Sequence, residues 1–196
     1  MKNPAFGLLF VFLMTANCLW VSGQSSWPMW RYDYHRSGYT PEQLADNLHL
    51  QWQVTFSPRI PVWDDPLNRD LMKYDRIFEP VVSGGNLFIG FNDQDKVVAL
   101  DLESGRENWH FFTDGPVRLP LATHNGKVYL TSDDGYCYCL DALNGSLVWK
   151  RLLAPSDNKL LGNKRLISMW PARGGIVIKD GVLYTGASIF PLMGTF

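Results

Sequence analysis

The sequence predicts an all-β fold built from repeated four-stranded antiparallel units, and three observations support this. An eleven-residue phrase running from Ala99 to Trp109 returns forty residues later, from Cys139 to Trp149. Before each phrase, short apolar runs alternate with turn residues, which is a hairpin pattern. Aromatic residues make up 14% of the chain, beside 17 Gly and 12 Pro, which agrees with strands joined by tight turns. A period near 40 residues with four strands per unit is typical of a β-propeller blade.

The phrase has a recurrent core of one aspartate, one glycine and one tryptophan. Aspartate accepts backbone hydrogen bonds in a turn, and glycine adopts a positive φ without steric cost. The tryptophan then supplies a large apolar side chain to the following strand. We expect each phrase to form a strand, a turn and a second strand. The equivalent structural residues are Asp101 and Asp141, Gly105 and Gly145, and Trp109 and Trp149.

The repeat divides the chain into blades. We expect a first blade at 79–118, a second blade with an insertion at 119–169, and an incomplete blade at 170–196. Because a closed propeller takes four to eight blades, we expect an N-terminal portion of a longer protein, whose remaining blades are its partners. In the first unit, strands are expected at about 80–83, 87–91, 96–100 and 106–111, with counterparts 40 or 41 residues later.

Residues 1–23 have the pattern of a secretory signal peptide. Lys2 gives the positive start, residues 6–14 are apolar, and Val21-Ser-Gly23 offers a small-residue cleavage site. The apolar run is too short to span a bilayer comfortably, so we expect no transmembrane span in the mature chain. We expect an exported protein, periplasmic or extracellular; a lipid anchor at Cys18 is less favoured, because the residue before it suits a lipid-attachment site poorly.

Residues 24–78 form an N-terminal segment before the first blade. Thr40 followed by proline suits the start of a short helical turn. Leu48–Val54 alternates in polarity and predicts a strand. Residues 57–78 are rich in Pro and Asp without periodicity, which predicts a long loop.

Composition excludes several functions. The formal net charge is −1 and no basic run occurs, so nucleic acid is not an expected partner. The four histidines have no metal-ligand spacing, and we assign no metal site.

Cys137 and Cys139 are interpreted as small core residues, since they align with Val97 and Ala99 of the first unit. Asp133-Asp134 is interpreted as a hairpin turn rather than a calcium ligand pair.

The phrase Ala-x-Asp-x-x-Ser-Gly-Arg-x-x-Trp at 99–109 resembles the tryptophan-docking motif of the pyrroloquinoline-quinone (PQQ)-like β-propeller repeat superfamily. Residues 115–196 resemble a secreted bacterial branch of that superfamily, to which no reaction is assigned. The resemblance implies that Trp109 and Trp149 wedge between adjacent blades, and that 48–54 is the outer strand of the closing blade. The segments that carry the closer match are 132–136, 161–168 and 170–174.

The resemblance leaves the cofactor unknown. In dehydrogenases of this superfamily, PQQ and calcium occupy the channel. Such an enzyme needs a catalytic Asp, acidic and amide calcium ligands, and a Trp beneath the quinone. None of these is matched residue by residue here, so no catalytic residue is assigned.

Two arginines are the sharpest ligand-binding candidates. Arg118 and Arg173 lie two residues before the first strand of successive units. Equivalent positions in adjacent blades face one axial space, where two cations favour an anionic small molecule such as a carboxylate-bearing quinone. Arg165 is a possible third cation. The alternative is that they pair with protein acids, of which Glu79 is the nearest candidate.

Loop tryptophans raise a third possibility. Trp63 and Trp170 are not accounted for by the docking motif, and exposed aromatic rings can bind sugars.

The leading hypothesis is an exported binding or scaffold protein that contacts another protein, like the propeller that helps to assemble outer-membrane proteins. The alternatives are a quinone-dependent alcohol or sugar dehydrogenase and a carbohydrate-binding propeller.

Overall fold

The computed structural model of the chain describes residues 26–57, 79–162, 165–188 and 194–196. Within these ranges every regular element is a β-strand, and no helix that could cross a membrane is found. The predicted signal peptide and most of the predicted long loop, with Trp63, lie outside the described residues.

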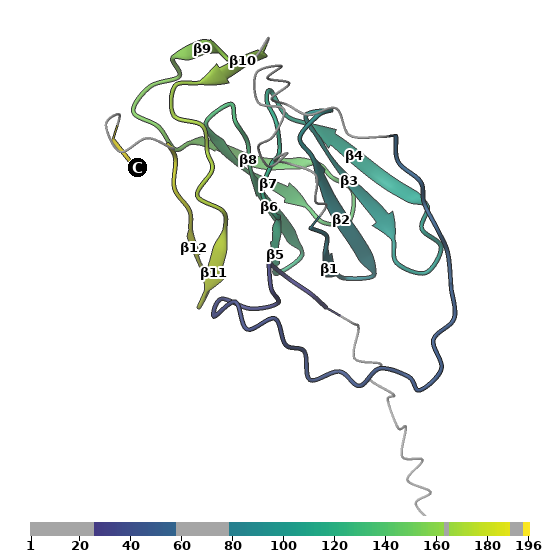
Figure 1. Cartoon of the computed structure of the whole chain (residues 1–196). Coiled ribbons are helices and arrows are strands. Elements are labelled where there is room, and N and C mark those ends of the chain that lie inside the picture. Colours follow the sequence, from purple (N-terminus) through teal and green to yellow (C-terminus); the bar gives the residue numbers. More distant parts are fainter. Residues whose placement is uncertain (1–25, 58–78, 163–164, 189–193) are drawn as a thin grey trace, which may run out of the picture.

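The first two blades are four-stranded antiparallel meanders, which confirms the predicted fold class of a partial propeller (Figure 1). Each ladder shifts register at the same place, between Ala99 and Leu100 and between Cys139 and Leu140. The repeated phrase therefore makes the same local structure twice. The first blade holds β1 (Val81–Ser83), β2 (Asn86–Phe91), β3 (Lys96–Asp101) and β4 (Glu107–Phe112); the second holds β5 (Ala122–His124), β6 (Lys127–Thr131), β7 (Tyr136–Asp141) and β8 (Leu147–Leu152).

The third unit is a hairpin, β11 (Val177–Lys179) with β12 (Val182–Tyr184). The insertion before it carries structure of its own. Its strands β9 (Lys159–Gly162) and β10 (Arg165–Ser168) form a second hairpin, which lies above the blades in Figure 1. Leu161 of β9 and Leu166 of β10 are paired across this hairpin and are both exposed.

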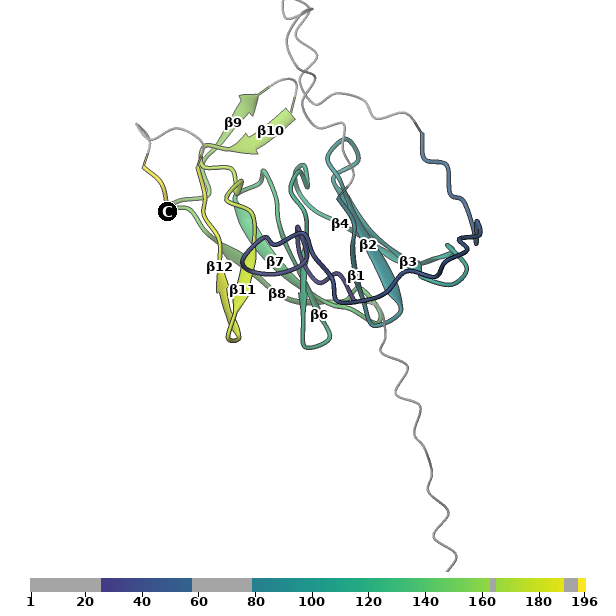
Figure 2. The same cartoon turned by 60° about the horizontal axis from the view of Figure 1, so that its bottom comes forward.

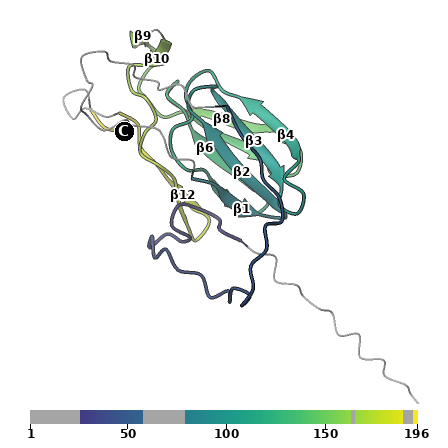
Figure 3. The same ribbon diagram turned by 45° about the vertical axis from the view of Figure 1, so that its right-hand side comes forward.

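Strand β7 of the second blade is buried on both faces of its sheet, and its side chains alternate between the two faces. Tyr138 and Leu140 join Phe88 and Trp109 of the first blade in one apolar cluster. Figure 3 shows the two sheets lying face to face. Cys137, which precedes Tyr138, points the other way, into a second cluster that contains residues of the third unit.

Both cysteines are buried and unbridged, as predicted. Burial raises the pKa of the Cys137 thiol to about 12, so it stays protonated at neutral pH and behaves as a small apolar side chain. The cysteines are therefore core residues.

The N-terminal segment crosses the inner strands of all three units (Figure 2). Trp27 pairs with Val82 of β1, and the Pro28 carbonyl accepts a hydrogen bond from the Thr123 amide of β5 at 2.7 Å. Arg36 Nη2 donates to the Ile176 carbonyl, just before β11, at 3.5 Å. The segment therefore runs along the first strands of the described blades.

Two predicted elements of this segment are not formed. Thr40 starts no helical turn; its hydroxyl only accepts the Glu42 amide, at 3.2 Å. Leu48–Val54 is not a strand, because a strand needs a partner and no described strand lies beside it. Its Trp52 nevertheless takes a docking position, as shown below.

Candidate functional site

Arg118 and Arg173 converge on one carboxylate, that of Asp133. Arg118 Nε donates to Asp133 Oδ2 at 2.6 Å. Arg173 forms a bidentate pair, from Nε to Oδ1 at 2.7 Å and from Nη2 to Oδ2 at 2.6 Å. The Asp133 side chain is 1% exposed, so the pairs are strong, charge-assisted hydrogen bonds in a buried site.

The turn after β6 fixes Asp133 through its backbone. Its amide donates to the Pro116 carbonyl at 3.0 Å, and its carbonyl accepts the Ser168 amide at 2.8 Å. These two bonds tie the turn to the segment entering the second blade and to the end of the insertion hairpin. The position of the Asp133 backbone is thus fixed by bonds that do not involve either arginine. We call Arg118, Asp133 and Arg173 the clasp.

Arg165 lies next to the clasp, on β10. Its guanidinium pairs with the Asp95 carboxylate and donates from Nη2 to the Asp93 carbonyl at 2.8 Å. Burial raises the pKa of the Asp95 carboxyl, an effect that Arg165 opposes and the nearby Asp133 charge reinforces. The insertion hairpin is thereby tied to the first blade.

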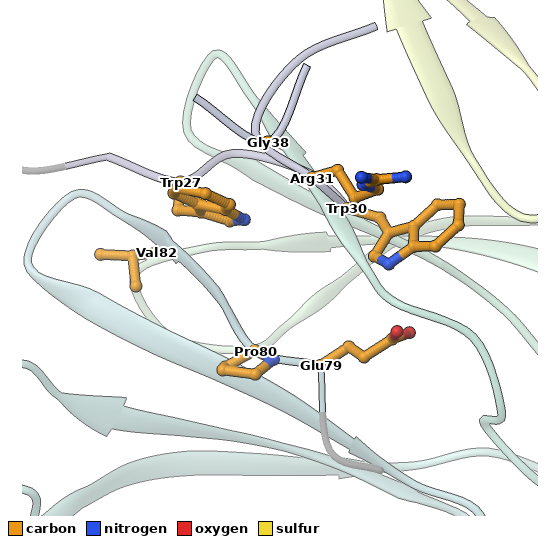
Figure 4. Close-up of a pocket in the computed structure, with 7 residues that line it drawn as sticks. All are labelled: Trp27, Trp30, Arg31, Gly38, Glu79, Pro80 and Val82. Atoms are coloured by element: carbon orange, nitrogen blue, oxygen red, sulfur yellow. The ribbon is translucent and has the colours of Figure 1, made fainter. Parts of the chain in front are cut away.

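The protein acid in the clasp is Asp133 rather than the expected Glu79. The interpretation of Asp133-Asp134 as turn residues describes their backbone correctly but omits the side-chain role of Asp133. The repeat places Asp93 at the equivalent turn forty residues earlier, but this equivalence does not identify Asp133 as the partner of the arginines. Glu79 instead lines a pocket with Trp27 and Trp30 (Figure 4).

The structural tryptophans dock one after another. The Trp52 indole lies over Gly105 and donates from Nε1 to the Leu102 carbonyl at 2.9 Å. The Trp109 indole lies over Gly145 and donates from Nε1 to the Ala142 carbonyl at 3.1 Å. Each ring thus covers the glycine turn of the next blade. Trp149 has no such turn beside it in the described residues and is 39% exposed.

The aspartates of the motif organise the same turns. Asp101 Oδ1 accepts the Ser104 hydroxyl at 2.6 Å and the Ser104 amide at 2.8 Å. Asp141 accepts Lys127 Nζ at 2.8 Å and the Leu143 amide at 3.0 Å. These bonds hold the pKa of both carboxyls below the ordinary value.

Trp170 lies apart from the pocket that contains Glu79. Its ring is half-buried and meets Phe196 edge to face, with centroids 6.3 Å apart. Its amide donates to Ser168 Oγ at 3.1 Å. The structure therefore brings Arg118 and Arg173 to one carboxylate and pairs Arg165 with another, that of Asp95. Glu79 lines a separate pocket, and Trp170 closely follows Ser168, whose amide bonds to the Asp133 carbonyl.

Comparison with known proteins identifies a match over much of the chain. A family model described as "Outer membrane protein assembly factor BamB" matches residues 47–182, which is more than half of the sequence. The matched range contains both complete blades and the clasp.

Individual relatives are enzymes of greater length. A 1-butanol dehydrogenase (cytochrome c) of Thauera butanivorans is 32% identical over 99 residues, 43% of this chain and 14% of the relative. The crystal structure of quinohemoprotein alcohol dehydrogenase from Comamonas testosteroni is 21% identical with a TM-score of 0.54, covering 83% of this chain and 23% of that one. A europium-containing methanol dehydrogenase is 19% identical with a TM-score of 0.53, covering 83% and 27%. These two structures establish likeness of fold, and the chain spans a small part of each relative.

Proposed function

The chain belongs to the PQQ-like repeat family whose model is described as outer membrane protein assembly factor BamB, and from this premise we propose that it acts as an exported scaffold that binds other proteins without catalysing a reaction. In this proposal other blades or chains complete the fold, and the assembled propeller presents its loops and outer strands to a partner. This proposal includes the export that the N-terminal sequence predicts.

One observation supports the proposal most strongly. The arginines that a quinone site would need for the carboxylates of its cofactor are paired with a carboxylate of the protein itself. Arg118 and Arg173 both donate to the buried Asp133 carboxylate, and Arg165 pairs with Asp95. Displacing Asp133 to admit a ligand carboxylate would leave a buried anion without its partners, which is costly. The clasp is therefore suited to joining blades.

The described residues do not fit the cofactors of the superfamily. Calcium needs several oxygen ligands around one point. Within the described ranges, no three His, Cys, Asp or Glu side chains gather as metal ligands do. PQQ carries carboxylates, and the two candidate arginines already hold a protein carboxylate. No catalytic step through either group is derived.

A quinone-dependent dehydrogenase is the second candidate. The observation that favours it is the 32% identity to the 1-butanol dehydrogenase over 99 residues. In that case Arg118 and Arg173 would exchange Asp133 for a ligand anion, and the remaining blades would supply the catalytic groups.

Titration of the full-length protein separates the two candidates. Calorimetry with PQQ plus calcium, and separately with simple dicarboxylates, is run on wild type, Arg118→Ala and Arg173→Ala, beside a dye-linked alcohol oxidation assay. The scaffold predicts no saturable binding and no oxidation. Tight PQQ binding that both substitutions weaken, together with alcohol oxidation, would overturn it.

A cellular measurement addresses the scaffold role directly. If the source organism has an outer membrane, deletion of the gene there should lower the amount of folded outer-membrane proteins, and the wild-type gene should restore it. An unchanged outer-membrane protein profile would contradict a role in their assembly.

A further inference from the structure

The N-terminal segment builds a pocket beside the first strand of the first blade. The pocket has a volume of about 660 Å³, which falls in the range of small-molecule sites. One wall comes from the N-terminal segment and the other from the residues that lead into β1 (Figure 4). The lining residues are Trp27, Trp30, Arg31, Gly38, Glu79, Pro80 and Val82.

The two indoles give this pocket broad apolar surfaces. Trp27 is anchored by its backbone pairing with Val82 and by an edge-to-face contact with Tyr32, at 5.3 Å between centroids. Trp30 is 42% exposed, and the Arg36 guanidinium lies 4.8 Å from its ring centroid. A large aromatic ring left open to solvent beside a pocket is a surface available for a ligand.

Two opposite charges stand in the same pocket without a bond between them. Glu79 is half-buried, and neither its carboxylate nor the Arg31 guanidinium has a hydrogen bond or ion pair among the described residues. This distinguishes the pocket from the clasp, where each carboxylate oxygen is engaged. Both groups can therefore bond to a ligand.

The loop that carries Arg31 and follows Trp30 is held in an unusual backbone conformation. Arg31, Tyr32 and Arg36 have positive φ angles of 56°, 80° and 59°. Such angles are unfavourable for residues with side chains and persist where surrounding bonds enforce them. Here the Gly38 amide donates to the Arg31 carbonyl at 2.8 Å, and Asp33 accepts both the amide and the hydroxyl of Ser37. The indoles are thus presented by a preorganised loop.

The combination of groups selects the ligand class. The pocket lining carries one negative and one positive side chain, Glu79 and Arg31, so neither a net anion nor a net cation finds a lining of opposite net charge. A wholly apolar ligand would desolvate Glu79 and Arg31 without giving them partners. A zwitterion could pair its two charges with Glu79 and Arg31. Ion pairs at an exposed site add little binding free energy, because both charges lose hydration when they pair. A neutral molecule with flat apolar faces and several hydroxyl groups meets every requirement.

We propose that this pocket binds a neutral saccharide unit, with its apolar ring faces against Trp27 and Trp30 and its hydroxyl groups bonded to Glu79 and Arg31. Glu79 accepts hydroxyl hydrogen bonds and Arg31 donates to hydroxyl oxygens. The proposal involves no reaction, and it stands independently of the scaffold role. It also uses tryptophans other than the Trp63 and Trp170 singled out by the sequence.

The test is a glycan array screen with the full-length protein, followed by calorimetry with the saccharide bound best. Trp30→Ala removes an exposed ring and should weaken binding about tenfold or more, as loss of an aromatic anchor does. Glu79→Gln keeps the shape and removes the charge, and should weaken binding about tenfold. Tyr39→Ala is the matched control, because Tyr39 is an exposed aromatic of the same segment outside the pocket.

Three outcomes overturn the proposal. The first is an array on which no neutral saccharide binds. The second is equal weakening by Trp30→Ala and Tyr39→Ala, which would mean a general effect of the segment. The third is displacement of the saccharide by a zwitterionic dipeptide at equal concentration, which would assign the pocket to peptides. Unchanged melting temperatures in the variants verify that affinity alone has changed.

Discussion

The two faces of the second blade are held by different forces. On the side of the first blade, Trp109 is 8% exposed, covers Gly145 and joins a large apolar cluster. On the side of the third unit, the equivalent Trp149 is 39% exposed and contacts the Tyr129 ring, with centroids 6.0 Å apart. There the smaller apolar cluster is supplemented by the clasp. A docking tryptophan is therefore buried where the next blade brings its glycine turn against the ring.

The clasp and the pocket differ in a similar way. In the clasp, a buried carboxylate has arginine partners and joins structural elements. In the pocket, a half-buried carboxylate and a guanidinium stand open beside two indoles. Charged groups in one propeller therefore serve either packing or recognition, according to whether the protein itself supplies their partners.

Replacing the docked tryptophan should have the largest effect. Trp109→Ala removes a buried indole and its hydrogen bond to Ala142, and should lower the free energy of unfolding by about 3–5 kcal/mol. In the 196-residue chain, Trp149→Ala is the matched control, because no described glycine turn covers its ring, and it should cost below about 1 kcal/mol. Urea denaturation measures both. Equal losses would show that the two faces are held alike.

Removing the carboxylate of the clasp should come next. Asp133→Ala leaves Arg118 and Arg173 facing each other in a buried site, and should cost about 3 kcal/mol. Asp157→Ala is the control, because Asp157 is exposed and its pair with Lys159 is 3.8 Å long; it should cost below about 0.5 kcal/mol. If Asp133→Ala left the free energy of unfolding unchanged, the third unit would be held by its apolar cluster alone.

Glycine substitutions sharpen the docking comparison. Gly145 has a φ of 72°, and a Cβ there would lie 2.5 Å from Trp109 Cε3. Gly126 has a similar φ of 69° with no described neighbour within 4 Å of the added Cβ. Gly126→Ala should cost about 1 kcal/mol from the backbone alone, whereas Gly145→Ala should cost about 2–3 kcal/mol because it also displaces the indole. Thermal unfolding of the two variants measures this difference. Similar melting temperatures for Gly126→Ala and Gly145→Ala would argue against close docking of the Trp109 ring on Gly145.

The smallest effect concerns pH. The pKa of Asp101 and of Asp141 lies below the ordinary 3.8 in the folded protein. Since the folded value is the lower one, their contribution is complete above the unfolded pKa and is lost as the pH falls through the folded pKa. Unfolding curves between pH 2 and pH 7 should show wild type losing stability below about pH 4. The loss should be shallower in Asp141→Asn, and an unchanged pH profile would contradict this role.

Much of the fold follows from the sequence because its causes are local. The period of the repeat, the turn glycines and the two-residue alternation of β7 depend on residues close together in the chain, and they predict the strands of both complete blades. The alignment of Cys137 and Cys139 with Val97 and Ala99 predicts their burial correctly for the same reason. The convergence of Arg118 and Arg173 follows from repeat equivalence, although their common partner does not.

Tertiary structure decided what no local pattern contains. Trp109 and Trp149 occupy equivalent positions, but their exposure differs because burial depends on the element packed against them. Asp133 meets Arg173 across 40 positions of sequence, and Glu79 meets the indoles of a segment that precedes the first blade. Contacts of this kind are fixed when sheets pack and distant segments meet. The sequence by itself determined which residues form the blades, and only the packed structure determined which charges became the clasp and which the pocket.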